Sequence, residues 1–109
     1  MTDRLEDPMW SLVLFDLPVL TRAQARAATQ FRNLLLDLAY QRVQLSVYAR
    51  FSPTANSLVT AIKKIKRSIP DGGEVRILSI TDHQWASAFR FSAAPTRVPS
   101  DAPEQLTIF

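Results

Sequence analysis

The chain has 109 residues, 47% of them hydrophobic, which suffices for one small domain with a real core. It contains no cysteine and a single histidine, His83, so disulfides, cysteine-ligated zinc and catalysis by two histidines of one protomer are excluded. The formal charge of +3 is compatible with a polyanionic partner but does not require one. The polar, acidic N-terminus is not a signal peptide, and every apolar run is too short to span a bilayer. We therefore expect a soluble, cytoplasmic protein that does not bind a membrane.

The first predicted elements are a strand and a long helix. Residues Met9 to Phe15 are nearly all apolar, which is typical of a strand buried on both faces. Thr21 is the expected N-cap of a helix that covers "RAQARAATQFRNLLLDLAY". With Phe31 at the centre of the core face, helical spacing adds Ala27, Ala28, Leu34, Leu35 and Leu38 to that face. Arg22 and Arg26 then lie on the opposite, solvent side.

The next stretch, "RVQLSVYARF", has the alternation of a strand over ten residues, with Val43 to Phe51 apolar at every second position. A bulge or tight bend could split it into two strands, although it contains no turn signal. Ser52-Pro53-Thr54 opens a second helix, whose expected buried stripe is Leu58, Ile62, Ile65 and Ile69. "PDGG" predicts a turn, and "EVRILSI" predicts a further strand.

This order of elements predicts an α+β, ferredoxin-like βαββαβ domain over residues 1–91. Residues 92–102 have the composition of a linker, and residues 103–109 form an apolar C-terminal stretch with strand character. Two helices cover only one face of the sheet, yet the first and last strands are apolar on both faces. We therefore expect a homodimer packed through sheet faces, with the C-terminal strand added to a sheet edge.

Asp16 is the candidate catalytic and metal-binding residue. A carboxylate at the end of a core strand lies at the edge of a sheet, where it can ligate Mg²⁺ or another divalent cation. One carboxylate is a poor site, but in a two-fold dimer Asp16 would meet its copy and hold the ion against a phosphate. The alternative is that Asp16 caps the turn before Thr21. We expect His83 to be a surface loop residue without a catalytic role, and the two glycines to serve a turn, not a phosphate loop.

The two helices carry almost no acidic residues to balance their cations. The candidate nucleic-acid-binding residues are Arg22, Arg26, Lys63, Lys64, Lys66 and Arg67. Such residues are usually part of a solvated surface, but a surface of one sign also suits contacts with phosphates in preference to base reading.

The sequence resembles the CRISPR-associated Cas2 family, the small subunit of the spacer-acquisition complex. The resemblance covers nearly the whole chain, through "MWSLVLFDLP", "TRAQARAATQFRNLLLDLAYQRVQLSVYAR", "IKKIKRSIPDGGEVRILSITDHQW" and a terminal "PEQLTIF" that looks like that of type II systems. It implies a ferredoxin-like homodimer that bridges two dimers of the larger integrase subunit and holds double-stranded foreign DNA on a basic surface. It also implies that Asp16 occupies the metal position of members described as nucleases acting on RNA or DNA. Two departures are the extra residues Met1 to Pro8 and Ala39, which stands where many relatives carry glycine.

Three functions follow as hypotheses. The first, which we favour, is a structural adaptor that bridges integrase dimers and holds duplex DNA during spacer acquisition. The second is a magnesium-dependent endonuclease, a hydrolase that cuts phosphodiester bonds with paired Asp16 residues. A regulatory domain that binds a metabolite is disfavoured, because no glycine-rich or polar pocket motif occurs in the sequence.

Overall fold

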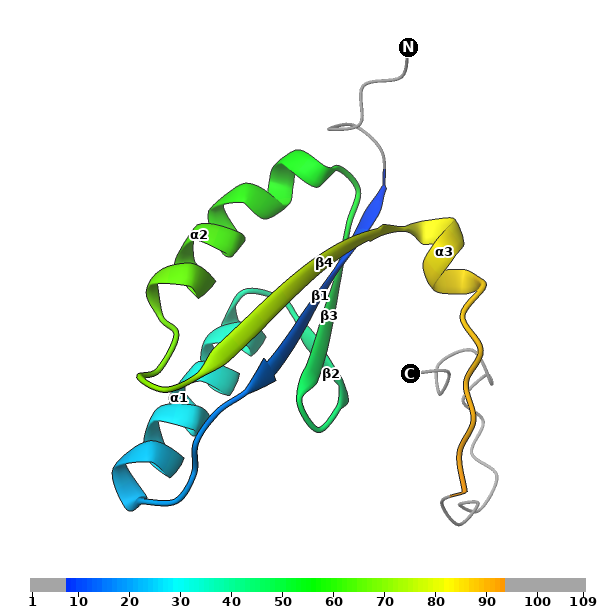
Figure 1. Ribbon diagram of the computed structural model, residues 1–109. Coiled ribbons are helices and arrows are strands. Elements are labelled where there is room, and N and C mark those ends of the chain that lie inside the picture. The colour runs from blue at the N-terminus through cyan, green and yellow to red at the C-terminus, as the bar shows by residue number, and fades with distance from the viewer. Residues whose placement is uncertain (1–7, 94–109) are drawn as a thin grey trace.

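The described residues form an antiparallel sheet of four strands in the order β2-β3-β1-β4. The computed structural model describes residues 8–93, and two helices cover one face of the sheet (Figure 1). In chain order the elements are β1 (Met9–Asp16), α1 (Arg22–Asp37), β2 (Gln41–Gln44), β3 (Val47–Ser52), the 3₁₀-helix η2 (Ala55–Leu58), α2 (Val59–Arg67), β4 (Glu74–Thr81) and α3 (Asp82–Ala86). This confirms the predicted α+β, ferredoxin-like βαββαβ architecture.

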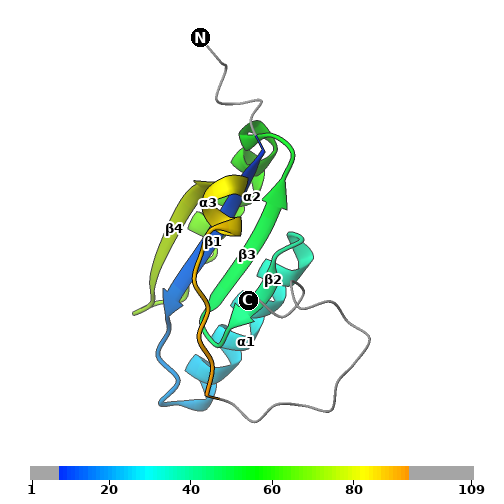
Figure 2. The ribbon, with the colours of Figure 1, turned by 90° about the vertical axis from the view of Figure 1, so that its right-hand side faces the viewer.

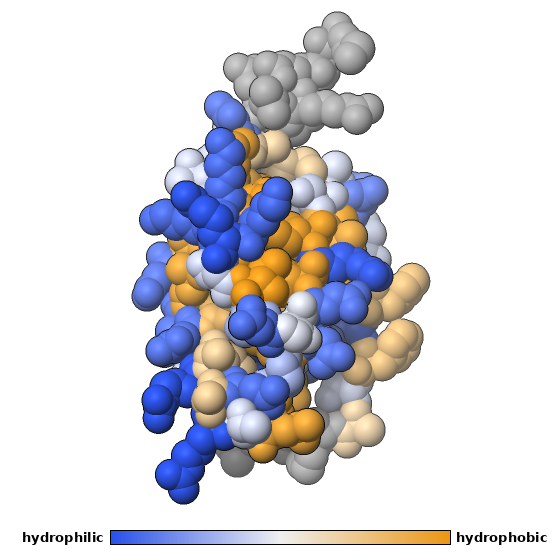
Figure 3. Space-filling model, turned by 60° about the vertical axis from the view of Figure 1, so that its left-hand side comes forward, coloured by the Kyte–Doolittle hydropathy of each residue, from blue (hydrophilic) through white to orange (hydrophobic). Residues whose placement is uncertain are grey.

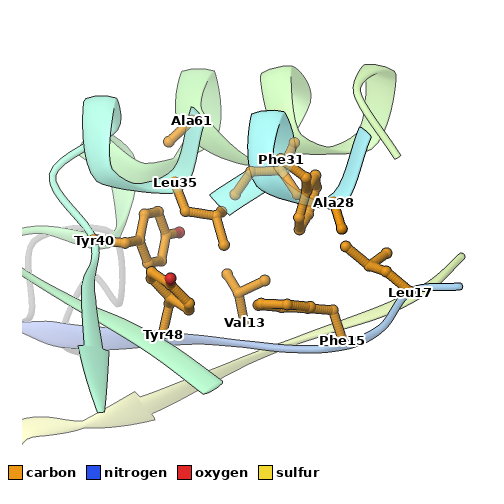
Figure 4. Packing of buried hydrophobic residues seen from close by; sticks show 10 residues of the cluster. Val13, Phe15, Leu17, Ala28, Phe31, Leu35, Tyr40, Tyr48 and Ala61 are labelled. Atoms are coloured by element: carbon orange, nitrogen blue, oxygen red, sulfur yellow. The ribbon is translucent and has the colours of Figure 1, made fainter. Parts of the chain in front are cut away.

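The core lies between β1 and the two helices. Val13 and Phe15 point from β1 toward Phe31 and Leu35 of α1, and Ile65 of α2 completes the cluster (Figure 4). The rings of Phe15 and Phe31 meet edge to face, with centroids 5.4 Å apart. The predicted core face of α1 is confirmed at Ala28, Phe31 and Leu35, which are buried. The other three predicted residues, Ala27, Leu34 and Leu38, are only half-buried.

Both ends of α1 have hydrogen-bonded caps. At the start, the Thr21 hydroxyl accepts a hydrogen bond from the Gln24 amide, and the Gln24 side chain accepts one from the Thr21 amide. This capping box confirms the predicted N-cap. At the end, the amide of Tyr40 donates to the Leu35 carbonyl, while Ala39 adopts a φ of 70°. Glycine is the residue that suits this left-handed position, so the backbone of Ala39 is strained.

The second helix differs from its prediction at both ends. It begins as the 3₁₀ turn η2 and becomes α-helical only at Val59. Leu58 and Ile65 are buried as expected, but Ile62 is only half-buried and Ile69 is 36% exposed. The expected stripe was therefore wrong at Ile69, because α2 ends at Arg67 and the chain then turns through Pro70 to Gly73.

The predicted ten-residue strand is in fact two strands. β2 and β3 are joined by a turn at Leu45 and Ser46, and the ladder between them is irregular between Arg42 and Gln44. The alternative of a split strand was the right one. Within β3, Tyr48 points into the core and is 3% exposed, whereas Phe51 on the opposite face is 45% exposed. The more apolar side of β3 thus faces away from the helices.

One polar pair is buried between the sheet and α1. The hydroxyls of Ser11 and Tyr40 lie 2.8 Å apart and share a hydrogen bond, and both residues are at most 1% exposed. Burial raises the pKa of Tyr40 above its ordinary value. The tyrosine therefore stays neutral and its hydroxyl remains available to Ser11.

The face of the sheet away from the helices is partly covered by α3 and the segment that follows it, which lie in front of the sheet in Figure 2. Trp10 of β1 stacks on Trp85 of α3 at 4.7 Å and donates a hydrogen bond to Asp82. Beyond α3, Phe89 and Phe91 are each 89% exposed. His83 lies in α3, not in a loop as expected, and is exposed.

Several predictions fall on residues outside the described range. These are most of the linker over 92–102 and the whole C-terminal strand over 103–109, which stay predictions, as do the domain boundaries. In the part of the chain from 8 to 93, no helix has the length and apolar character needed to cross a membrane.

Candidate nucleic-acid interface

The six candidate nucleic-acid-binding residues all lie in the helix layer. Arg22 and Arg26 belong to α1, and the other four, Lys63, Lys64, Lys66 and Arg67, belong to α2. All six are exposed. In the described range the one salt bridge joins Arg76 to Glu74, so none of the six is neutralised by an acidic side chain there.

The two groups of cations approach each other because α1 and α2 run antiparallel. The first turn of α1 and the last turns of α2 lie toward the same end of the helix layer (Figure 1). The loops at this end are in contact: a Cβ placed at Gly73, after α2, would lie 2.6 Å from Leu17 Cδ2, before α1. The fold thus brings together charges that are about forty residues apart in the sequence.

The N-terminus of α1 adds to the positive potential at this end, whereas the C-terminus of α2 carries a partial negative charge that the cations of its last turn outweigh. The N-terminus of a helix carries a partial positive charge, and the first turn of α1 contains no acidic residue to offset it. In α2, Lys64, Lys66 and Arg67 occupy the last turn, where cations stabilise the helix. Figure 3 shows this side of the molecule, with hydrophilic side chains projecting around a central apolar patch. The arrangement suits a long, repeating polyanion.

Asp16 lies at the same end of the domain but on the other face of the sheet. It is the last residue of β1, and alternation places it with Leu14 on the face away from the helices. Its carboxylate is exposed and makes no hydrogen bond or ion pair with residues 8–93. The alternative that Asp16 caps the following turn is wrong, because the side chain of Gln24 accepts from the amides of Leu20 and Thr21.

Two residues that were not predicted as site residues flank Asp16. Glu74 is its direct partner in the antiparallel ladder, and Arg76 lies two residues further along β4. Together with Leu14 and Phe15 these three residues line a shallow hollow of about 250 Å³. The alternation of "EVRILSI" predicts that Glu74 and Arg76 share one face of a strand. No local sequence pattern predicts that this strand pairs with β1 beside Asp16.

The hollow contains oxygen ligands that suit a divalent cation but too few for a complete site. Mg²⁺ is usually held by one or two carboxylates together with water and substrate phosphates. Asp16 and Glu74 provide two carboxylates from adjacent strands. Within residues 8–93 no group of three or more potential metal-ligating residues occurs, so Asp16 and Glu74 provide only part of a coordination sphere.

The remainder of this sheet face is mostly apolar. Leu12 and Leu78 are paired across β1 and β4, and Leu78 is 44% exposed. A hollow of about 390 Å³ separates Leu12 and Val47 from the segment around Phe89. An exposed apolar surface of this kind is typical of an interaction site.

The sequence matches a family of known proteins and several of its named members. The family model for CRISPR associated protein Cas2 matches residues 9–88. A protein of Paracidovorax avenae named CRISPR-associated endoribonuclease Cas2 is 41% identical over 101 residues, which are 93% of this chain and 94% of the relative. A protein of the same name from Flavobacterium psychrophilum is 35% identical, over 93% of this chain and 88% of the relative.

Solved structures show the same fold at lower identity. A crystal structure described as cas2 superposes with a TM-score of 0.62 at 15% identity and covers 89% of this chain and 99% of that one. The Streptococcus pyogenes Cas2 structure at pH 6.5 gives a TM-score of 0.60 at 22% identity and covers 76% of this chain and 99% of its own. With the family model matching nearly every described residue and relatives matching almost end to end, this chain belongs to the Cas2 family of CRISPR-associated proteins.

Proposed function

We propose that this chain is the DNA-holding adaptor of a CRISPR adaptation complex. The observation that carries the proposal is the group of six exposed cations at one end of the helix layer, none of them paired with an acid in residues 8–93. Each such cation can replace a counterion on a phosphate, which gives affinity without base reading. A protein that must accept foreign DNA of any sequence needs this kind of binding.

The adaptor would act as a homodimer packed through sheet faces. Support comes from the apolar residues left on the face away from the helices, among them Phe51 at 45% and Leu78 at 44% exposure. A second copy is the simplest partner for such a surface, since a two-fold dimer uses the same patch twice. Light scattering should give a dimer at micromolar concentration, and a stable monomer would contradict this part of the proposal.

In this function the dimer bridges two dimers of the integrase subunit, which would carry out the chemistry of integration. The assignment to a type II system remains a prediction from the C-terminal stretch. The test is spacer acquisition in cells that carry Asp16→Ala or the paired change Arg22→Gln/Arg26→Gln. We expect normal acquisition with the first variant and reduced acquisition with the second. Loss of acquisition with Asp16→Ala alone, in a folded protein, would count against a purely structural role.

The second candidate function is a metal-dependent endonuclease. It is supported by the name endoribonuclease given to relatives such as that of Paracidovorax avenae, and by the free, exposed carboxylate of Asp16. In this function Asp16, with its copy in the second protomer, would hold Mg²⁺ or another divalent ion, which would supply Lewis-acid stabilisation of a phosphodiester. The carboxylate of Asp16 would bind the ion and fix its place in the site.

The endonuclease function has its own test. Purified protein should cleave labelled RNA or DNA in the presence of Mg²⁺, and both EDTA and Asp16→Asn should abolish cleavage. Asp71→Asn is a matched control, because Asp71 is an exposed acid in the turn before β4. Cleavage that survives Asp16→Asn would assign the activity to another residue or to a contaminant.

A further inference from the structure

Among residues 8–93, Arg76 is the one cation that lines the hollow beside Asp16. In the ladder between β1 and β4, Leu14 is opposite Arg76 and Asp16 is opposite Glu74, so Arg76 and Asp16 are diagonal neighbours. Diagonal neighbours on one face of an antiparallel pair lie within reach of long side chains. The guanidinium therefore lies near the place where a group bound at Asp16 would be.

The present partner of Arg76 is a weak one. Its guanidinium nitrogen lies 3.8 Å from a carboxylate oxygen of Glu74, and the two side chains are 70% and 80% exposed. Ion pairs in such exposed positions contribute little, because water screens them and both side chains keep their freedom. Arg76 can therefore leave Glu74 for a better ligand at almost no cost.

The charges in the hollow indicate what that ligand is. Asp16, Glu74 and Arg76 carry two negative charges and one positive charge, so the hollow by itself repels an anion. A divalent cation at the carboxylates would make the sum positive by one unit, which complements the single negative charge of a phosphodiester. Without Arg76 the same site would be neutral. The guanidinium also offers a planar fork of donors that matches two phosphate oxygens.

We infer that Arg76 is the phosphate-binding residue of the Asp16 hollow, and that Glu74 competes with the phosphodiester for it. The inference rests on the second candidate function and adds to it the residue that holds the substrate. It gives the protein two separate anion-binding surfaces. The helix layer binds duplex DNA through many phosphates, and the hollow on the opposite face binds one phosphodiester.

The test measures the binding of a short, labelled single-stranded oligonucleotide to the full chain in Ca²⁺, which takes the same oxygen ligands as Mg²⁺ and gives the hollow its net positive charge. Recovery of the intact oligonucleotide after the titration checks that cleavage does not interfere. Arg76→Ala should weaken binding roughly tenfold, the effect of one hydrogen-bonded charge pair. It should also lower the slope of log affinity against log salt by about 0.7, the value for one phosphate of a single strand. Arg76→Lys should recover part of the affinity, and duplex affinity should not change.

Arg42→Ala is the matched control, since Arg42 is also exposed but lies on β2, at the opposite edge of the sheet. If Arg42→Ala and Arg76→Ala weaken binding equally, the effect is one of net charge and the inference is wrong. In EDTA, where Glu74 holds no cation, Glu74→Gln should strengthen binding, and the gain should shrink when Arg76 is already alanine. An equal gain in both backgrounds would refute the competition between Glu74 and phosphate.

Cleavage in Mg²⁺ separates this inference from the function on which it rests. If the wild type cleaves, Arg76→Ala should lower kcat/KM while Arg42→Ala leaves it unchanged. If the wild type cleaves neither RNA nor DNA, the endonuclease function fails, and the binding comparison in Ca²⁺ still decides the role of Arg76. All variants change exposed residues, and circular dichroism should be used to check that each is folded.

Discussion

The paired change Arg22→Gln/Arg26→Gln tests whether the helix layer binds DNA through phosphate charges. Both side chains are exposed, they lie one turn apart on α1, and neither has an acidic partner in residues 8–93. Each cation that contacts a phosphate of duplex DNA adds about 0.9 to the slope of log affinity against log salt. The double variant should therefore lower the slope by about 1.8.

The salt dependence expected for the wild-type protein follows from the six cations of the helix layer. If all of them contact phosphates, one chain gives a slope of about 5, and affinity falls roughly a thousandfold between about 50 and about 200 mM salt. Fluorescence anisotropy of a labelled duplex of arbitrary sequence, titrated over a series of salt concentrations, measures both slopes. A second duplex of different sequence should give the same affinity within error.

The control is Arg42→Gln/Arg90→Gln, which removes the same charge from exposed positions outside the helix layer. We expect this variant to keep the wild-type slope. An unchanged slope for Arg22→Gln/Arg26→Gln in a folded protein would show that α1 does not contact DNA. An equal fall in the control would show that affinity depends on net charge, with no defined surface.

Three predictions concern the stability of the fold, each measured by urea unfolding. Tyr40→Phe should lower the free energy of unfolding by about 1–3 kcal/mol, because it leaves the buried hydroxyl of Ser11 unpaired. Adding Ser11→Ala should recover part of this loss, and strictly additive effects of the two changes would contradict the hydrogen bond. Thr21→Ala should lower the free energy of unfolding by about 1 kcal/mol, because it removes the hydroxyl of the capping box. An unchanged urea midpoint would mean that the cap does not stabilise the protein. Ala39→Gly should stabilise the protein by about 1 kcal/mol because it removes the strain of a positive φ, and a destabilised variant would contradict this explanation.

Local patterns in the sequence were sufficient for most of the elements. Helical spacing identified Phe31 and Leu35 as core residues of α1, and Thr21 was recognisable as its N-cap. These features depend on residues within a few positions of one another, so a single sequence contains the information. The exposure of Arg22 and Arg26 was also predictable from local sequence, because helical spacing places both on the side of α1 opposite Phe31.

Other features depended on contacts between distant segments. The split between β2 and β3 has no turn signal, and the exposure of Ile69 depends on where α2 ends. Periodicity shows which residues share a face but not which face is buried, and so it could not show that Tyr48 points into the core. Burial is decided by the layer that packs against the strand, and here both helices pack on the same side.

The sequence by itself determined an α+β fold of the Cas2 family with cations exposed on its helices. It also singled out Asp16 as the carboxylate at the end of the first strand. Only the tertiary structure decided what lies beside it. Glu74 and Arg76 are nearly sixty residues away along the chain, and they reach Asp16 because β4 pairs with β1 in one particular register. Register is fixed by the packing of whole strands against a shared core, and no short stretch of sequence contains that information.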